Sequence, residues 1–158
     1  MTSGLRSFGL TVGMAALLAG AAACSDNKTG AEHFVGTWTY AGMINPLCAG
    51  TAETPLDLTG YSVVVTEIDQ AHISVQLGTM CTVKFDVDGF KANAQPNQSC
   101  MFVIGSYGSQ TVMIKTWTLT STGTDTITSD FPGTAFICTA DGTGSLARQA
   151  GGDAGAVD

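Results

Sequence analysis

The segment MCTVKFDV, residues 80–87, alternates apolar and polar side chains with a period of two. One face carries a cysteine and three large apolar residues, Cys81, Val83, Phe85 and Val87. The opposite face is polar apart from Met80. Successive side chains of an extended chain point to opposite faces, so this pattern is typical of a β-strand that buries one side.

The same alternation recurs along most of the chain, as in YSVVVTEI at 61–68 and AHISVQLG at 71–78. No segment of ten residues has helical periodicity, and Gly, Asp, Asn and Pro interrupt the apolar runs at short intervals. These features predict an all-β fold. The expected strands are residues 35–43, 61–68, 71–78, 80–87, 89–94, 99–105, 110–120, 123–130, 134–140 and 143–147.

Short turn signals separate the expected strands. They are Asp88-Gly89, Pro96-Asn97, Gly108-Ser109 and Thr122-Gly123. Turns of this kind join neighbouring antiparallel strands, so we expect an up-and-down meander. A sheet with one apolar face must close on itself or pack on a second sheet, and the pattern alone allows either a β-barrel or a β-sandwich.

Residues 1–23 have the layout of a secretory signal peptide. Arg6 supplies a positive charge, and an apolar run of 16 residues follows from Phe8 to Ala23. That run is shorter than the roughly 20 residues that cross a bilayer as a helix. A permanent transmembrane anchor is therefore the less favoured interpretation.

Three small residues lead directly into Cys24, and polar residues follow it. This junction resembles the lipobox of bacterial lipoproteins, although Ala21 stands where that family most often has Leu. The resemblance implies a diacylglycerol on the Cys24 thiol and acyl chains that hold the protein at a membrane. In that family, an Asp directly after the cysteine is the signal for staying in the inner membrane. Ser25 stands at this position, so the resemblance implies the outer membrane. The alternative is an ordinary secretory signal cut after Ala23, which leaves Cys24 unmodified.

Removal of residues 1–23 leaves 135 residues, the length of one domain. Five basic and thirteen acidic residues then give a net charge of about −8, which disfavours nucleic acids and anionic lipid headgroups as partners. We expect residues 24–32 to be the lipidated cysteine and a flexible tether, and residues 33–148 to be the β-barrel domain. Residues 149–158, rich in Gly, Ala and Asp, are expected to be a disordered tail.

The segment FVGTWTY at 34–40 places Gly36 and Trp38 in a G-x-W pattern on the first expected strand. It resembles the signature of the lipocalin and calycin superfamily. That resemblance implies a barrel of eight or nine strands, closed at one end by Trp38 packing against a basic residue of the last strand, here Arg148. The alternative is that Trp38 is a core aromatic residue of an unrelated sandwich.

A wider arrangement also resembles the small, cysteine-bearing, lipocalin-like lipoproteins of some Gram-negative bacteria. It runs GTWTYAG…C…CTVKFDVDGFKANAQPNQSC…IKTWTLT…ICTADGTGSLAR and covers most of residues 34–148. The resemblance supports the fold far more than any function.

Four cysteines remain besides Cys24, an even number that indicates two disulfides in an exported chain. No C-x-x-C pair occurs, which disfavours a zinc site. Four cysteines allow three connectivities. We favour a Cys81–Cys100 bridge, because each of these cysteines lies at the start of a strand, on the face that also carries apolar residues. We also favour Cys48–Cys138, because these two residues become neighbours if the barrel closes.

The chain offers few residues for catalysis. His33 lies at the domain edge and His72 on the polar face of its strand, and no nucleophile-elbow, zinc-protease or phosphate-loop motif occurs. Asp86-x-Asp88-Gly89 has a fragment of calcium-loop spacing, but a hairpin turn explains it. We therefore expect no enzyme activity, no cofactor and no metal.

Two functions fit these features. The first is a binding module of the cell envelope that holds an apolar small molecule in its barrel. The second is an interaction or protease-inhibitor-type lipoprotein that meets an envelope protein through its loops. The segment INPLCAGTAETPLDLTG, residues 44–60, is the irregular loop expected to serve there.

Overall fold

The computed structural model describes residues 30–123, 125–135 and 138–150. The expected signal peptide, Cys24, residues 24–29 of the expected tether and residues 151–158 of the expected tail lie outside the described residues.

Eight antiparallel strands form a closed ring, in which each strand pairs with the next along the chain and the last pairs with the first. The all-β prediction is confirmed, and the fold is a barrel rather than a sandwich. The strands of the ring are β1 (Gly36–Cys48), β4 (Ser62–Asp69), β5 (His72–Leu77), β6 (Cys81–Asp88), β7 (Lys91–Ala94), β10 (Thr118–Ser121), β11 (Thr126–Ala135) and β12 (Cys138–Arg148).

Further elements decorate this ring. The strands β2 (Thr51–Ala52) and β3 (Leu56–Asp57) pair with β1. The strands β8 (Ser99–Val103) and β9 (Ser109–Ile114) form a hairpin between β7 and β10, joined through η2 (Gly105–Tyr107). A 3-10 helix, η1 (Gly30–His33), precedes β1.

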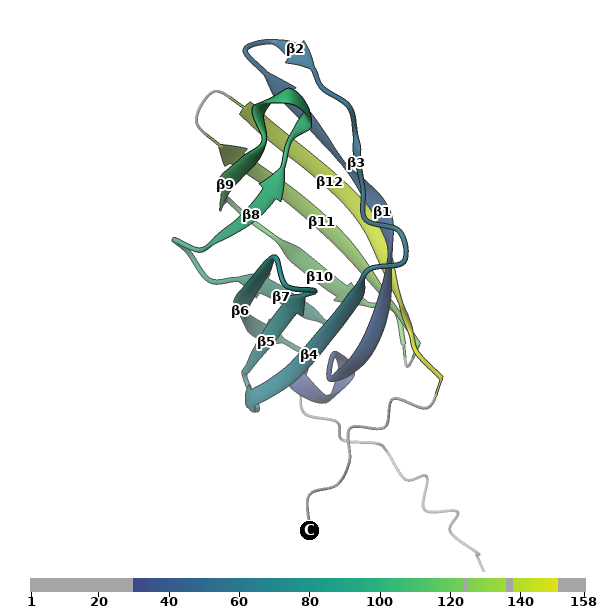
Figure 1. The fold of residues 1–158 in the computed structure, drawn as a ribbon. Helices are drawn as coiled ribbons and strands as arrows, with labels where there is room; N and C mark the ends of the chain where they lie inside the picture. The colour runs from purple at the N-terminus through teal and green to yellow at the C-terminus, as the bar shows by residue number, and fades with distance from the viewer. Residues whose placement is uncertain (1–29, 124, 136–137, 151–158) are drawn as a thin grey trace, which may run out of the picture.

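Three long strands give the molecule two distinct ends (Figure 1). β1, β11 and β12 extend beyond the short strands β4 to β7 and β10, and the β8–β9 hairpin lies beside their upper part. β1 and β12 pair without interruption from Trp38↔Arg148 to Cys48↔Cys138. η1 and the end of β12 lie at the opposite end of the barrel.

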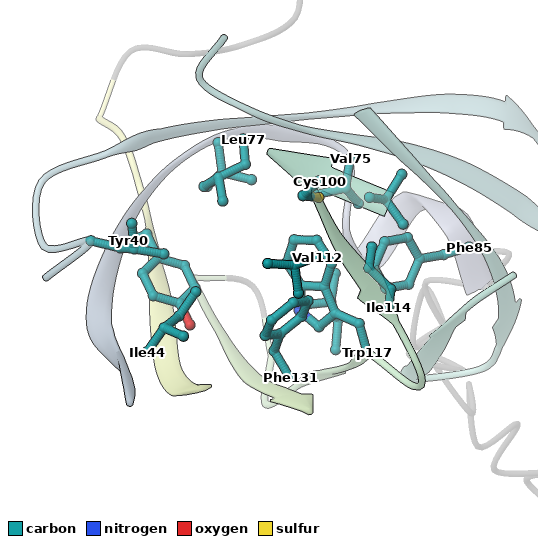
Figure 2. Packing of buried hydrophobic residues seen from close by; sticks show 14 of the residues in the cluster. Tyr40, Ile44, Val75, Leu77, Phe85, Cys100, Val112, Ile114, Trp117 and Phe131 are labelled. Atoms are coloured by element: carbon teal, nitrogen blue, oxygen red, sulfur yellow. The ribbon is translucent and has the colours of Figure 1, made fainter. Parts of the chain in front are cut away.

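Aromatic side chains fill much of the interior (Figure 2). The Phe85, Trp117 and Phe131 rings are in edge-to-face contact, with centroids 5.3 Å and 5.4 Å apart. Phe102 of β8 makes the same kind of contact with Phe131 at 6.0 Å. Offset and edge-to-face arrangements are the favoured geometry for aromatic pairs.

Small residues on β12 make room for these large side chains. Gly142 and Gly144 continue the strand on its inward-facing side, and a Cβ on Gly144 would collide with the Tyr40 ring. A Cβ on Gly142 would press on Ile44. Small residues opposite large ones are a common way to fill a narrow barrel.

This packing corrects the prediction of separate strands at 134–140 and 143–147. The segment around Asp141-Gly142 is not a turn, because β12 runs through it to Arg148. The glycines serve close packing here rather than a change of chain direction.

The predicted strand 110–120 is two strands, β9 and β10. The alternation of buried and exposed residues fails between them, because Lys115 and Thr116 are both exposed while Ile114 and Trp117 are both buried. β11 then pairs with β10 along its first half and with β9 along its second. Pro132 lies at the change of partner, where no described residue is paired with it on that side.

The expectation that residues 44–60 form an irregular loop is also wrong in part. Residues 44–48 complete β1, and the chain then folds back along the same strand. The pairings Cys48↔Thr51 and Ile44↔Leu56 mark this return. The returning segment covers the edge of β1 beyond its pairing with β4.

Candidate functional site

One end of the barrel is closed by residues from its first and last strands. The Arg148 guanidinium lies 4.2 Å from the Trp38 ring centroid, and its Nη1 donates a hydrogen bond to the Val35 carbonyl at 2.9 Å. Trp38 is fully buried and its Nε1 donates to the Phe34 carbonyl at 2.8 Å. Gly36, at φ 139°, leaves the space that the guanidinium occupies.

Both favoured disulfides are present. Cys48 and Cys138 face each other across β1 and β12, with Cα atoms 4.0 Å apart, so Cys48 belongs to the strand and not to the loop after it. Cys81 and Cys100 join the starts of β6 and β8, with Cα atoms 4.8 Å apart. One cross-link therefore joins the end of β1 to the start of β12, and the other joins β6 to the inserted β8–β9 hairpin.

A small cavity remains in the core, with a volume of about 10 Å³. That is room for about one water molecule. An apolar molecule of several heavy atoms does not fit unless side chains move. The lining residues are Tyr40, Ile44, Leu58, Leu77, Phe102, Trp117 and Phe131.

A polar cluster adjoins this cavity. The buried Ser129 hydroxyl accepts a hydrogen bond from Trp117 Nε1 at 2.9 Å, and the Tyr40 hydroxyl lies 3.4 Å from it. Burial raises the pKa of Tyr40 above its ordinary value of 10.0, so its phenol stays protonated at neutral pH. Three buried polar groups, the Trp117 Nε1–H and the Ser129 and Tyr40 hydroxyls, are thus hydrogen-bonded to one another, and none of them is ionised.

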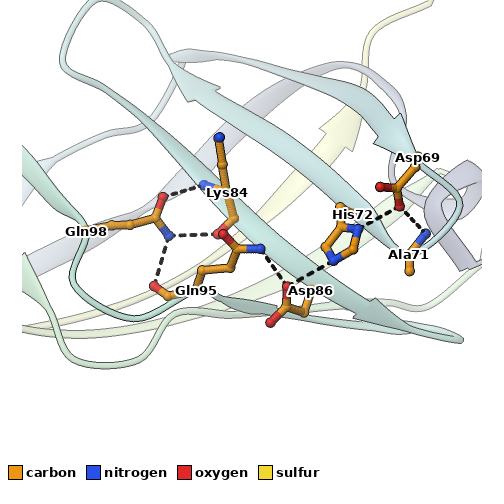
Figure 3. Close-up of polar contacts among 7 residues, drawn as sticks. All are labelled: Asp69, Ala71, His72, Lys84, Asp86, Gln95 and Gln98. Atoms are coloured by element: carbon orange, nitrogen blue, oxygen red, sulfur yellow. Dashed lines mark hydrogen bonds and ion pairs between the residues drawn. The ribbon is translucent and has the colours of Figure 1, made fainter.

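The barrel wall has a gap in its hydrogen-bonded ladder between β6 and β8. β7 pairs with β6 only over Phe85–Asp88, so the first half of β6 lacks a neighbouring strand there among the described residues. The side-chain amide of Gln98 partly replaces that strand (Figure 3). It accepts from the Lys84 N–H at 2.7 Å and donates to the Lys84 carbonyl at 2.8 Å.

β8 is the edge strand beside this gap. Within the described ranges it pairs only with β9 and ends the strand order of the sheet. The Ile104 N–H donates to Gly108, and the Ile114 N–H donates to Gln98, which fixes the even-numbered residues as those bonded to β9. The N–H and C=O groups of Met101 and Val103 therefore point to the open edge.

The side chains of this edge are apolar and exposed. Met101 is 57% exposed and Val103 is 61% exposed, and both lie on the outer face of β8. The whole hairpin, residues 99–114, contains no charged residue, although the chain carries a net charge of −7. Proteins usually protect such an edge with charges, a proline or a covering segment.

An open groove of about 290 Å³ runs along this edge. One wall is the turn at Thr79 and Met80, and the other is β8 with Ser109 of β9. We call it the β8 groove. Its lining is apolar and hydroxylic, with no charged side chain: Thr79, Met80, Met101, Phe102, Val103 and Ser109.

The two histidines lie away from the groove. His72 Nδ1 is 2.6 Å from Asp69 Oδ1 on the outer surface, and its Nε2 is 3.6 Å from Asp86 (Figure 3). Hydrogen bonds from the Ala71 N–H and from His72 lower the pKa of Asp69 below 3.8. His33 stacks on Phe90.

Neither a metal site nor a bilayer-spanning helix is found in the part of the chain that the structure describes. No three His, Cys, Asp or Glu residues are grouped there so that they could hold a metal ion. Over the same residues, no helix is long and apolar enough to cross a membrane. Asp88-Gly89, the fragment of calcium-loop spacing, forms the hairpin turn between β6 and β7, with Gly89 at φ 54°.

The β8 groove was not predicted from the sequence. The signal available in the sequence is the uncharged run of residues 99–114 in an acidic chain. That run predicts a hairpin but does not say which of its edges stays unpaired. The open edge arises because β7 is short and β10 begins only at Thr118, which only the three-dimensional pairing reveals.

The strand pairing defines the class of the protein, a closed eight-stranded antiparallel β-barrel with an inserted hairpin. No protein-family model and no curated protein matches the chain. Among solved structures, the chain is similar to a redesigned β-barrel, at 16% identity and a TM-score of 0.45. The similarity covers 80% of this chain and 100% of that one, and no functional residue is taken from it.

Proposed function

We propose that the protein is a lipid-anchored lipoprotein of the outer membrane, with a lipocalin-like barrel that acts as a binding module rather than as an enzyme. The observation that carries the binding role is the open, apolar edge of β8. Its N–H and C=O groups that point away from β9 have no partner strand among the described residues, and its Met101 and Val103 side chains are exposed, so the edge offers both backbone hydrogen bonds and apolar contact.

The partner proposed for this edge is an extended, uncharged segment of an envelope protein. An extended chain adds to a sheet edge by main-chain hydrogen bonds, while pockets beside the edge select alternate side chains. The β8 groove lies directly beside the edge and would receive an apolar side chain. This favours an interaction role over the storage of a ligand in the described core cavity, which has a volume of about 10 Å³.

Lipid anchorage is tested by acylation. The full chain is expressed in a Gram-negative host with a labelled fatty acid, beside the Cys24→Ser variant. We expect label on the wild type, none on the variant, and release of the variant from the membrane fraction. Label that persists on the variant, or no label on the wild type, contradicts the lipoprotein assignment.

Strand addition is tested with a photo-crosslinking residue at position 103 of the full chain. Met101→Pro removes an N–H that points to the open edge, so the β8–β9 ladder stays intact while pairing with a partner is blocked. Met101→Ala is the matched control, because it keeps the N–H and removes only the side chain. We expect discrete adducts from the parent, weaker ones from Met101→Ala and none from Met101→Pro.

Equal adducts from all three proteins would contradict strand addition. Circular dichroism and thermal melts of both variants check that the barrel is retained. An edge proline is tolerated where its nitrogen faces away from the ladder, so a melting temperature near that of the parent is expected.

A second candidate is the binding of an apolar small molecule in the core. The cavity beside Ser129 supports it, since it combines an aromatic lining with the Tyr40 and Trp117 polar groups. A ligand there would displace Phe102 or Phe131 from their contact. If the protein binds such a molecule, organic extraction of the purified protein, followed by mass spectrometry, is expected to yield a stoichiometric apolar compound. Its absence, together with adducts at position 103, favours the protein partner.

A further inference from the structure

The end of the barrel opposite the β8 groove brings together the start and the finish of the described domain. η1, the turn between β4 and β5, the turn between β6 and β7 and the last residues of β12 lie at this end (Figure 1). η1 is the first described element after the cysteine at position 24.

Phe90 stands out at this end. It forms the tip of the β6–β7 turn, and its side chain is 55% exposed. One side of the ring stacks on His33 of η1, with centroids 4.1 Å apart. η1 also packs on the same turn through Gly30, where a Cβ would meet Val87 and the Gly89 backbone. The exposed phenylalanine is therefore held against the segment that leads to Cys24.

Chain length links Phe90 to the proposed acyl chains. Gly30 is six residues after Cys24, and six residues span at most roughly 20 Å. β1 has 13 residues and is roughly 40 Å long. The tether is thus shorter than the barrel, and it leaves from the end that carries Phe90 and not from the end of the β8 groove.

We infer that this end of the barrel rests on the membrane and that Phe90 enters the boundary between lipid headgroups and acyl chains. The inference rests on the proposed lipid anchorage. Aromatic side chains are favoured at that depth of a bilayer. The acidic residues Glu32, Asp69, Asp88 and Asp125 outnumber the basic Lys91 and Arg148 at this end, so the surface that fits is zwitterionic and not anionic lipid. The β8 groove then faces away from the membrane.

Fluorescence quenching tests this orientation. Phe90→Trp and Val103→Trp variants of the full lipidated protein are reconstituted into phosphatidylcholine vesicles that carry a bromine quencher on the acyl chains. Trp38 and Trp117 are both buried and supply a constant background. We expect at least twofold stronger quenching for Phe90→Trp than for Val103→Trp, which marks the opposite end. Only protein that floats with the vesicles is measured.

The outcomes separate the two proposals. Protein that floats but shows equal quenching at both positions, or more at position 103, overturns the orientation and leaves the lipid anchor intact. Protein that does not float overturns the anchor and the orientation together. Ile68→Trp, at a second exposed apolar position next to the β4–β5 turn, replaces Phe90→Trp if that variant fails to fold, and the same result is expected of it.

Discussion

At the scale of single residues, the closed end of the barrel depends on a glycine. Gly36 has a φ of 139°, a conformation that L side chains rarely adopt, and its missing side chain leaves room for the Arg148 guanidinium. Arg148 in turn covers the Trp38 ring and reaches the Val35 carbonyl. One position thus determines whether the first and last strands can meet over the tryptophan.

Gly36→Ala is expected to destabilise the domain by about 2 to 3 kcal/mol, from backbone strain and from displacement of the guanidinium. In an Arg148→Ala background, where the guanidinium is already absent, the same substitution is expected to cost about 1 kcal/mol less. Urea unfolding of the four proteins gives this coupling. Additive effects would show that Gly36 and Arg148 act independently.

At the scale of the elements, the upper edge of β1 and the edge of β8 differ in whether another part of the chain covers them. The chain after β1 folds back and covers the upper edge of that strand, with the Leu58 N–H donating to the Gly42 carbonyl at 3.0 Å. No described segment does the same for β8, although its outer face carries Met101 and Val103. The contrast within one molecule is the reason to regard the β8 edge as a binding surface.

The disulfides are expected to differ in their contribution to stability. Cys48–Cys138 closes 90 residues and Cys81–Cys100 closes 19. The chain-entropy estimate gives roughly 4 to 5 kcal/mol for the longer loop and roughly 3 kcal/mol for the shorter one. Double Cys→Ser variants of each pair, compared by urea unfolding, measure the difference. A larger loss from the Cys81/Cys100 pair would contradict the estimate.

Period-two alternation predicted most strands to within a few residues, because one face of each strand is buried in the barrel. The predicted strand boundaries were wrong where contacts with residues distant in the sequence decide the structure. Asp141-Gly142 resembles a turn in sequence, yet Gly142 faces Ile44 inside the barrel. Lys115 and Thr116 interrupt the alternation. The break between β9 and β10 could therefore have been predicted from the sequence. The sequence of β8 contains no signal for its open edge. A strand lies at an edge because no other strand pairs with it, and that depends on segments elsewhere in the chain.

At the scale of the whole molecule, the two ends of the barrel are proposed to have different surroundings. The end with Phe90 and η1 is proposed to rest on lipid, and the end with the uncharged hairpin to meet a protein. The chain carries a net charge of −7, whereas residues 99–114 carry no charge that would oppose docking. Binding at the outward end would leave the membrane contact undisturbed.

Hydrogen exchange at single amides of β8 measures directly whether this edge is open. In the full lipidated protein in detergent micelles, the amides of Cys100 and Phe102, which face β9, are expected to exchange roughly 100-fold more slowly than those of Met101 and Val103. We expect fast exchange at Met101 and Val103, because their N–H groups point to the open edge. Protection of these two amides equal to that of Phe102 would mean that the edge is already covered, and would contradict the proposal that β8 is an open binding edge.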